Sequence, residues 1–358
     1  MSRENALSNI RCTAAQRWGR TEYSLEYHDE LVRKAAPGSA SPEARQRALF
    51  DSLGLDFMWG TDDGIRGDWG RFGRATDMGH AEYAANGSDM HAPKACPFKR
   101  VEEVWAFDPD AEYGLPGFDE QVRRYRTVDA EARAAYPGQF CTGGYYKTIV
   151  SGAIAAFGWD MLLEAAADRR RFEIVLDRFY RRTLFHMKAW AATDVEAVIQ
   201  HDDFVWTSGP FMDPAFYRAV IIPRYAELWK PIHAAGKKVL FCSDGNFSEL
   251  ASDIVAAGAD GLIFEPCNDF GSMAERFGDG CCLVGSAVDC RDLTFGRWDS
   301  VQDGLERTAA ALRRCSGAIL AVGNHIPANV PDDMVERYNA ALATMLERVP
   351  ASSREVFK

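Results

Sequence analysis

Acidic and imidazole side chains recur directly after the short apolar runs of this sequence. The candidate acid–base residues are Asp62, Asp63, Asp203, Asp244, Asp289 and His325. A carboxylate or an imidazole held beside a substrate can give or take a proton, so these residues are predicted to be catalytic. Crowded carboxylates disfavour each other's ionised form, so we expect a raised pKa for at least one of them.

A metal site is predicted among the same strand-end residues. Cys242, Glu265 and His325 offer a thiol, a carboxylate and an imidazole, which are ligand types that zinc accepts. Zinc is therefore the candidate metal. The alternative is structural, because an aspartate after a strand often caps a helix and a buried cysteine often only packs. His325 can likewise be a core histidine.

Aromatic and amide side chains near the same strand ends are predicted to bind the substrate. The set comprises Trp59, Tyr145, Tyr146, His201, Trp206, Asn246 and Asn324. Aromatic rings offer large flat apolar surfaces, which favours a flat or apolar substrate. Aromatic residues make up 12% of the chain, so some would lie in such positions without any role in binding.

The apolar runs that precede these residues alternate with helical patterns from about residue 195 onward. The predicted strands are 195–204, 238–242, 261–265, 281–288 and 318–322, and the predicted helices are 213–236, 247–257, 272–277, 300–315 and 331–349. Nearly continuous apolar strands are typical of parallel sheets covered by helices. Without a glycine-rich dinucleotide fingerprint, this series favours an α/β fold, a single (β/α)8 TIM barrel, over a doubly wound sheet.

The remaining barrel strands must lie upstream, where the pattern is weaker. Residues 55–59 are the predicted first strand and residues 101–107 a candidate further strand, with helices at 149–167 and 171–192. The long segment 60–95, rich in glycine and aspartate, is predicted to cap the C-terminal mouth of the barrel.

This arrangement is expected to divide the chain into two parts. Residues 1–45 are expected to form an N-terminal helical arm, and residues 46–358 the barrel. In a closed barrel the eighth strand adjoins the first, so His325 is expected to face Asp62 or Asp63 across that junction.

Composition excludes several classes of protein. The 358 residues are 47% hydrophobic and 26% charged, which is typical of a globular domain. The net charge of −11 argues against a nucleic-acid binder. The sequence contains no long apolar run without charged residues, so no membrane span is predicted. The nine cysteines lack any C-x-x-C pair, and the N-terminus lacks an apolar signal segment, so a reducing cytoplasm is expected.

Three segments resemble the uroporphyrinogen decarboxylase superfamily, which includes cobalamin-dependent methyltransferases and demethylases. They are CSDGN at 242–246, Asp289 after LVGSAV, and GNHIPANVPDDMVERY at 323–338. The resemblance covers roughly residues 45–350 and implies a (β/α)8 barrel with its active site in the mouth.

The chain departs from the family pattern at two places. Decarboxylases carry an Arg-rich loop of the type MRQAGRYLPEY, whereas residues 11–28 read RCTAAQRWGRTEYSLEYH and keep only Arg17 and Arg20 as cations. Related methyltransferases hold zinc with His-x-Cys and a later Cys. This chain has Cys242-x-Asp244, and Asn324-His325 where the last Cys is expected.

The leading function hypothesis is a methyltransferase or demethylase acting on a small aromatic, ether or amine substrate. The resemblance implies a corrinoid or folate-type carrier as methyl acceptor, and candidate partners are a corrinoid protein and a second copy of the chain. The alternative is a cofactor-free decarboxylase or lyase for a small aromatic or tetrapyrrole-like acid, in which Asp62 or Asp63 resembles the decarboxylase aspartate. A third hypothesis is a non-enzymatic protein that binds a small molecule. It predicts apolar residues at the strand ends, whereas those positions are mostly polar in this sequence.

Overall fold

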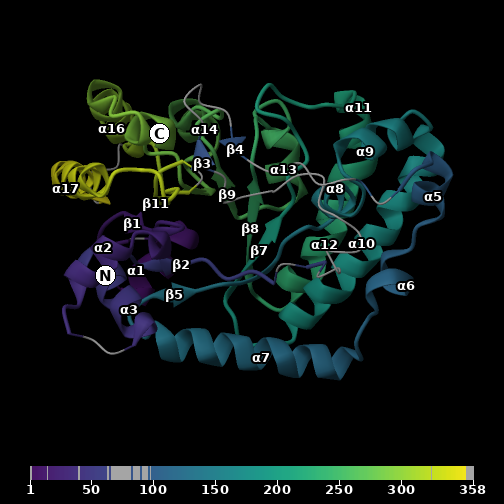
Figure 1. Ribbon diagram of the computed structural model, residues 1–358, viewed down its shortest axis with the longest axis horizontal. Coiled ribbons are helices and arrows are strands. Elements are labelled where there is room, and N and C mark those ends of the chain that lie inside the picture. Colours follow the sequence, from purple (N-terminus) through teal and green to yellow (C-terminus); the bar gives the residue numbers. More distant parts are fainter. Residues whose placement is uncertain are drawn as a thin grey trace.

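Strands and helices alternate through the C-terminal half as the apolar pattern predicts (Figure 1). The computed structural model describes residues 2–13, 15–38, 41–62, 64–65, 82–83, 89–90, 96, 98–323 and 325–351. The parallel strands are β1 (Gly19–Arg20), β2 (Phe57–Met58), β5 (Phe140–Cys141), β6 (Gly143–Tyr145), β7 (Ala197–His201), β8 (Lys238–Ser243), β9 (Gly261–Phe264), β10 (Cys282–Val284) and β11 (Ala318–Leu320).

Helices of very different lengths connect these strands. Before β7 they are α1 (Arg3–Ile10), η1 (Leu25–Tyr27), α2 (Asp29–Ala35), α3 (Pro42–Ser52), α5 (Val101–Ala106), α6 (Pro109–Tyr113), α7 (Phe118–Ala135), α8 (Val150–Phe157), α9 (Trp159–Ala166) and α10 (Arg169–Ala191). After β7 they are α11 (Pro214–Phe216), the π-helical turn η2 (Tyr217–Ile221), α12 (Ile222–Ala234), α13 (Ala251–Ala257), α14 (Phe270–Phe277), α15 (Cys290–Thr294), α16 (Trp298–Leu312) and α17 (Asp332–Arg348).

The parallel strands follow one another around a barrel. One sheet has the order β1-β11-β10-β9-β8-β7-β6, and a second joins β2 to β5. Because β5 and β6 are parts of one extended segment interrupted only at Thr142, that segment links the two sheets. The prediction of an α/β barrel of the (β/α)8 type is confirmed, with one irregular junction between β1 and β2.

Individual backbone and side-chain hydrogen bonds hold that junction together, because no β-ladder joins β1 to β2 in the described chain. The Asp56 N–H donates to the Arg20 carbonyl at 2.8 Å, and the Thr21 hydroxyl donates to the Phe57 carbonyl at 2.9 Å. The fully buried Asp56 carboxylate also accepts two bonds from the Arg17 guanidinium, at 2.5 and 2.7 Å. The first and second strands are therefore joined chiefly through Asp56.

The N-terminal half differs from the sequence prediction in two ways. Residues 55–59 were expected to contain the first barrel strand, but β1 precedes them within the segment expected to be a helical arm. Residues 101–107 form helix α5 rather than a strand, and the Glu103 carboxylate accepts the Arg100 N–H at its start. Of the predicted cap, only a short antiparallel pair, β3 (Glu82–Tyr83) and β4 (Asp89–Met90), and a few isolated residues are described.

Helix α1 closes the N-terminal end of the barrel. Its residues Ala6, Leu7 and Ile10 pack in one buried cluster with inward side chains of β7, β8, β10 and β11. The Asn9 side chain accepts the Ala318 N–H at 3.1 Å, next to the start of β11. The opposite, C-terminal end, here called the mouth, is the end at which a barrel of this type places its chemistry.

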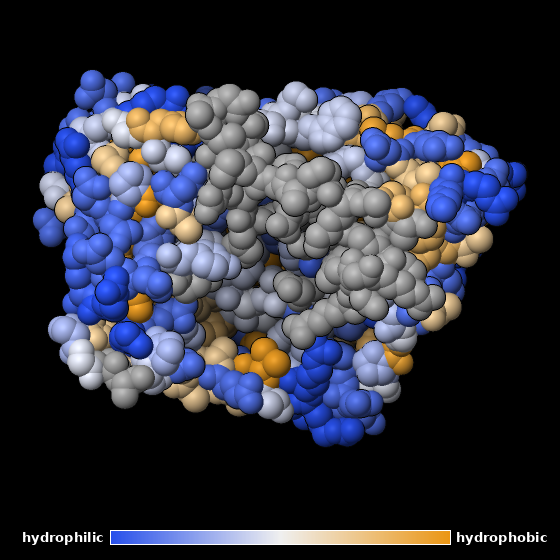
Figure 2. Space-filling model, viewed as in Figure 1, coloured by the Kyte–Doolittle hydropathy of each residue, from blue (hydrophilic) through white to orange (hydrophobic). Residues whose placement is uncertain are grey.

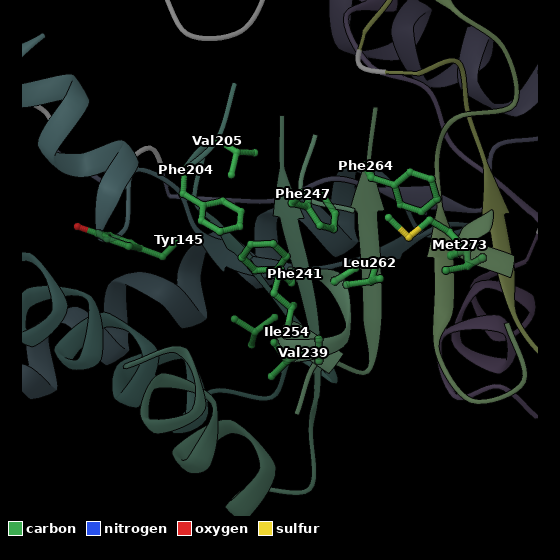
Figure 3. Close-up of a cluster of buried hydrophobic side chains, with 14 of the residues drawn as sticks. Tyr145, Phe204, Val205, Val239, Phe241, Phe247, Ile254, Leu262, Phe264 and Met273 are labelled. Carbon is green, nitrogen blue, oxygen red and sulfur yellow. The ribbon is translucent and has the colours of Figure 1, made fainter. Parts of the chain in front are cut away.

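A larger apolar layer fills the space between the strands and the surrounding helices. Figure 3 shows Phe204, Phe241 and Phe247 close together on the outward side of β7 and β8. The Phe241 ring lies edge-on to both Phe204 and Phe247, with centroid distances of 5.6 and 5.7 Å. Packed aromatic pairs of this kind fix the strands that carry the mouth residues.

The described surface is largely polar (Figure 2), and the cysteines are not joined to one another. On the face seen in Figure 2, the described surface is mostly hydrophilic with small apolar patches. None of the helices within the described ranges is both long and apolar enough to cross a lipid bilayer. All nine cysteines carry free thiols.

Glu22 is a buried carboxyl group just after β1. It accepts the Val322 N–H at 3.1 and 3.2 Å, and burial raises its pKa to about 7 although that hydrogen bond and Arg20 oppose the shift. The folded chain therefore holds a proton there that the unfolded chain releases near pH 4.3. Stability from this group is highest at low pH and falls as pH rises toward 7.

Replacing Glu22 with glutamine is expected to abolish the fall in folding stability that Glu22 causes as the pH rises. At pH 8 the variant should exceed the wild type in unfolding free energy by about 3 kcal/mol, the cost of ionising a group whose pKa is raised this far. Near pH 4.5 the two proteins should differ little. Urea unfolding at both pH values measures this, with the exposed Glu131→Gln as control; an equal difference at both pH values would rule the explanation out.

Candidate functional site in the barrel mouth

Alternation along the strands determines which side chains reach the mouth. Ile199 of β7, Leu240 and Cys242 of β8 and Ile263 of β9 face the barrel interior, while their chain neighbours pack against the helices. Because successive side chains of a strand point to opposite sides, the next inward positions follow at intervals of two. These positions are His201 at the end of β7, Asp203 after β7, Asp244 after β8 and Glu265 after β9.

Asp203 is the centre of a hydrogen-bonded cluster in the mouth. Its Oδ1 accepts from His201 Nε2 at 2.9 Å and from the Asp244 N–H at 2.9 Å, and its Oδ2 accepts from the Tyr146 hydroxyl at 3.0 Å. Burial tends to raise the pKa of Asp203, but the charge of His201 and these hydrogen bonds outweigh it and hold the pKa below its ordinary value. The expected rise in carboxyl pKa is therefore not found at this residue.

Aromatic rings form a wall beside this cluster. Tyr146 stacks on His201 with a centroid distance of 4.0 Å, and the Trp59 and His201 rings lie edge-on at 5.5 Å. Tyr23, from the segment after β1, lies edge-on to Trp59 at 5.0 Å. The structure thus brings three of the predicted substrate-binding residues, Trp59, Tyr146 and His201, into one surface.

Tyr23 is a mouth residue that the sequence analysis missed. Burial and the nearby charges of Cys242, Glu22 and Asp244 raise its pKa well above the ordinary value, so the phenol stays protonated. Its buried hydroxyl makes no hydrogen bond of normal geometry within the described chain, and Thr21 nearby donates to Phe57. The only signal in the sequence was alternation from Thr21, and the two-residue strand β1 was too short to reveal it.

The predicted zinc ligands do not form a site together. Cys242 and Glu265 both lie at the mouth, but His325 follows β11, which is separated from β8 by β9 and β10. Within the described residues, the His201, Asp203 and Asp244 ligand atoms lie within 4.8 Å of one another, whereas those of Cys242, Glu265 and His325 do not make such a group. We therefore derive no reaction step through a thiolate zinc centre.

Cys242 and Glu265 have other surroundings. Burial, followed by the charges of Asp244, Asp203 and Glu265, raises the pKa of the Cys242 thiol well above its ordinary value. The Glu265 carboxylate accepts the Gly245 N–H at 2.7 Å. The first residue is thus a protonated thiol in the barrel interior, and the second supports the loop that carries Asp244.

Asp62 and Tyr145 face the helices instead of the mouth. The Asp62 carboxylate accepts from Arg124 at 2.8 Å and from the Tyr125 hydroxyl at 3.1 Å, both on α7. Tyr145 stacks on His186 of α10 at 4.2 Å, and Figure 3 shows its hydroxyl pointing away from the strands. Because Tyr145 and Tyr146 are chain neighbours, only one of them can face the interior.

The remaining candidates lie at the rim or beyond the described residues. Asp289 caps α15 by accepting the Arg291 N–H at 2.8 Å, the Asn246 side chain accepts the Ser248 N–H at 3.1 Å, and Trp206 is 42% exposed. Asp63 and Asn324 are outside the described residues.

The structure pairs Asp62 with α7 and not with His325, and Asp63, the alternative partner expected for His325, lies outside the described residues. Strand β1 lies between β11 and β2, and the Ile326 N–H donates to the Tyr23 carbonyl at 3.2 Å. His325 itself is buried and adjoins the Tyr23 segment through this neighbour. The prediction failed because it placed the first strand at residues 55–59.

Comparison with known proteins places the chain in context. The family model described as "Uroporphyrinogen decarboxylase (URO-D)" matches residues 160–344. No curated protein matches the sequence significantly.

Among solved structures, one shares the fold over almost its whole length. A methyltransferase from Methanosarcina mazei superposes with a TM-score of 0.55 at 12% identity, covering 96% of this chain and 97% of that protein. A xylose isomerase-like TIM barrel protein from Mycobacterium smegmatis gives a TM-score of 0.34 at 11% identity, with 86% and 91% covered. The first of these likenesses shows a shared fold.

Proposed function

The chain belongs to the uroporphyrinogen decarboxylase family, and on this premise we propose that it moves a methyl group from a small substrate to a corrinoid or folate-type carrier. The observation that supports this best is the cluster of His201, Asp203 and Asp244 beside an aromatic wall in the mouth. Methyl transfer is favoured over decarboxylation because the full-length structural neighbour is a methyltransferase. The residues at 11–28 also lack the Arg-rich motif expected of a decarboxylase.

The chemistry requires an electrophile at the atom that loses the methyl group. The bond between carbon and the heteroatom breaks with its electron pair left on the heteroatom, while the carrier's nucleophile forms the new bond to carbon. A poor leaving group such as an alkoxide or amide anion therefore needs a proton or a Lewis acid. The mouth cluster lies where such an electrophile can be held.

Each mouth residue has a distinct part in this proposal. Asp203 orients the His201 ring through the 2.9 Å hydrogen bond and fixes the Tyr146 hydroxyl. Tyr146 and Trp59 provide flat apolar surfaces for the substrate next to His201. Tyr23 remains protonated and so can donate a hydrogen bond to a substrate oxygen or nitrogen.

Methyl transfer is tested with the purified chain, a panel of methylated ethers, amines and thiols, and either cob(I)alamin or tetrahydrofolate as acceptor. At least one donor should yield methylated acceptor, and Asp244→Asn should lower the rate at least about a hundredfold. His233→Ala is the matched control, because His233 pairs with Asp260 at 2.9 Å away from the mouth. Release of CO2 from aromatic acids, with neither acceptor methylated, would support the decarboxylase alternative instead.

A further inference from the structure

We propose that His201, Asp203 and Asp244 bind one divalent cation of the class that accepts mixed imidazole and carboxylate ligands, such as Mn²⁺, Fe²⁺, Co²⁺ or Zn²⁺. The inference rests on the proposed function in one respect, since the cation supplies the electrophile that the methyl transfer needs. It differs from the thiolate zinc site that the family resemblance suggests, because its ligands come from the ends of β7 and β8 and include no sulfur.

The spacing of the ligand atoms fits a bound cation. Two ligands at about 2.1 Å from a metal and at right angles to each other lie about 3.0 Å apart. His201 Nε2 and Asp203 Oδ1 are separated by 2.9 Å. One ligand atom from each of His201, Asp203 and Asp244 lies within 4.8 Å of the other two, which leaves room for Asp244 to turn toward a common centre.

Neighbouring side chains orient Asp203 and His201. In known metal sites, residues around the ligands act in the same way. The Tyr146 hydroxyl binds Asp203 Oδ2, and this leaves Oδ1 on the side of His201. The imidazole ring stacks on Tyr146 and lies edge-on to Trp59, and these two contacts restrict its rotation. Outer contacts that orient ligands typically contribute ten- to hundredfold to metal affinity.

A second observation points to a missing ligand at this place. The buried Tyr23 hydroxyl makes no hydrogen bond of normal geometry within the described chain, although Cys242 and Asp244 are near enough for their charges to raise its pKa. Cys242 is only 4% exposed, so the space next to its thiol is shielded from solvent. Burying such donors without a partner is costly, and a water or substrate atom on a cation at Asp244 would accept from Tyr23.

His201, Asp203 and Asp244 are already joined by hydrogen bonds in the absence of an ion. A test variant should therefore remove a ligand atom without breaking these bonds. Asp244→Asn removes one charged ligand but keeps the backbone N–H that supports Asp203. It is therefore the variant least expected to disturb the fold. His233→Ala breaks a His–Asp pair of the same 2.9 Å spacing that has no third ligand, and it serves as the matched control.

Metal binding is measured on full-length protein stripped with EDTA, by titration with MnCl₂ followed by electron paramagnetic resonance and with ZnCl₂ followed by calorimetry. We expect one equivalent to bind, with affinity at least tenfold weaker in Asp244→Asn and in His201→Ala and unchanged in His233→Ala. Absence of saturable binding, or a folded Asp244→Asn that binds like the wild type, would overturn the inference.

The same experiment separates this inference from the proposed function. Binding of the ion by a protein that methylates neither acceptor would refute the methyl transfer alone. Methyl transfer at full rate by EDTA-treated, metal-free protein would refute the role of the cation as electrophile and leave the methyl transfer itself in place.

Discussion

The Asp203→Asn variant is expected to lose methyl transfer by at least about a hundredfold while remaining folded. The carboxylate accepts three hydrogen bonds, from His201, Tyr146 and the Asp244 N–H, and an asparagine has only one oxygen with which to accept them. The variant also loses the negative charge that holds the His201 ring or a bound cation. Loss of a residue that supports proton transfer or metal ligation commonly costs a hundredfold or more.

The comparison requires both a rate and a measure of folding. Initial rates of acceptor methylation are compared for the wild type, Asp203→Asn and the control His233→Ala, each checked by thermal unfolding. A rate within a few-fold of the wild type would show that Asp203 has no role in the chemistry. A loss of rate that only follows the fraction of unfolded protein would make Asp203 a structural residue.

The Asp56→Ala variant is expected to lose about 3–5 kcal/mol of unfolding free energy, because the Ser2 and Arg20 N–H groups lose a charged acceptor, at about 1.5–3 kcal/mol each. Asp56 is fully buried, and its carboxylate accepts from Arg17, from the Ser2 N–H at 2.6 Å and from the Arg20 N–H at 3.2 Å. The change leaves these donors without an acceptor where no β-ladder joins β1 to β2.

Urea unfolding gives this free energy directly. Glu306→Ala is the control, because it removes a carboxylate from an exposed ion pair with Arg348 at 2.7 Å. Exposed pairs contribute about 1 kcal/mol or less. If Asp56→Ala costs no more than this control, the junction of the barrel does not depend on Asp56.

Sequence reasoning succeeded where the elements are long. The strands that became β7 to β9 are apolar runs of at least four residues, and helices such as α12 and α17 begin near proline. It failed for β1 and β2, which have two residues each and are set by hydrogen bonds to Asp56 rather than by their own pattern. Two-residue strands give no periodic signal to detect.

The candidate site was predicted in part for the same reason. His201, Asp203 and Asp244 were found because they follow long strands, and their approach in space follows from neighbouring strands in register, as His201 opposite Cys242 shows. Asp62, Tyr145 and His325 were misplaced because the direction of a side chain depends on strand alternation and on which strand comes first. Strand alternation and the identity of the first strand could not be predicted from the sequence, because β1 and β2 have only two residues each.

The most direct test of the account follows two labels in one reaction. The donor is a methyl ether or methylamine that also bears a carboxyl group, with one isotope in the methyl carbon and another in the carboxyl carbon. We predict that the methyl label appears on the corrinoid or folate acceptor and that the carboxyl label stays in the demethylated product. Carboxyl label released as CO2, with the methyl label retained in the product, would contradict the account.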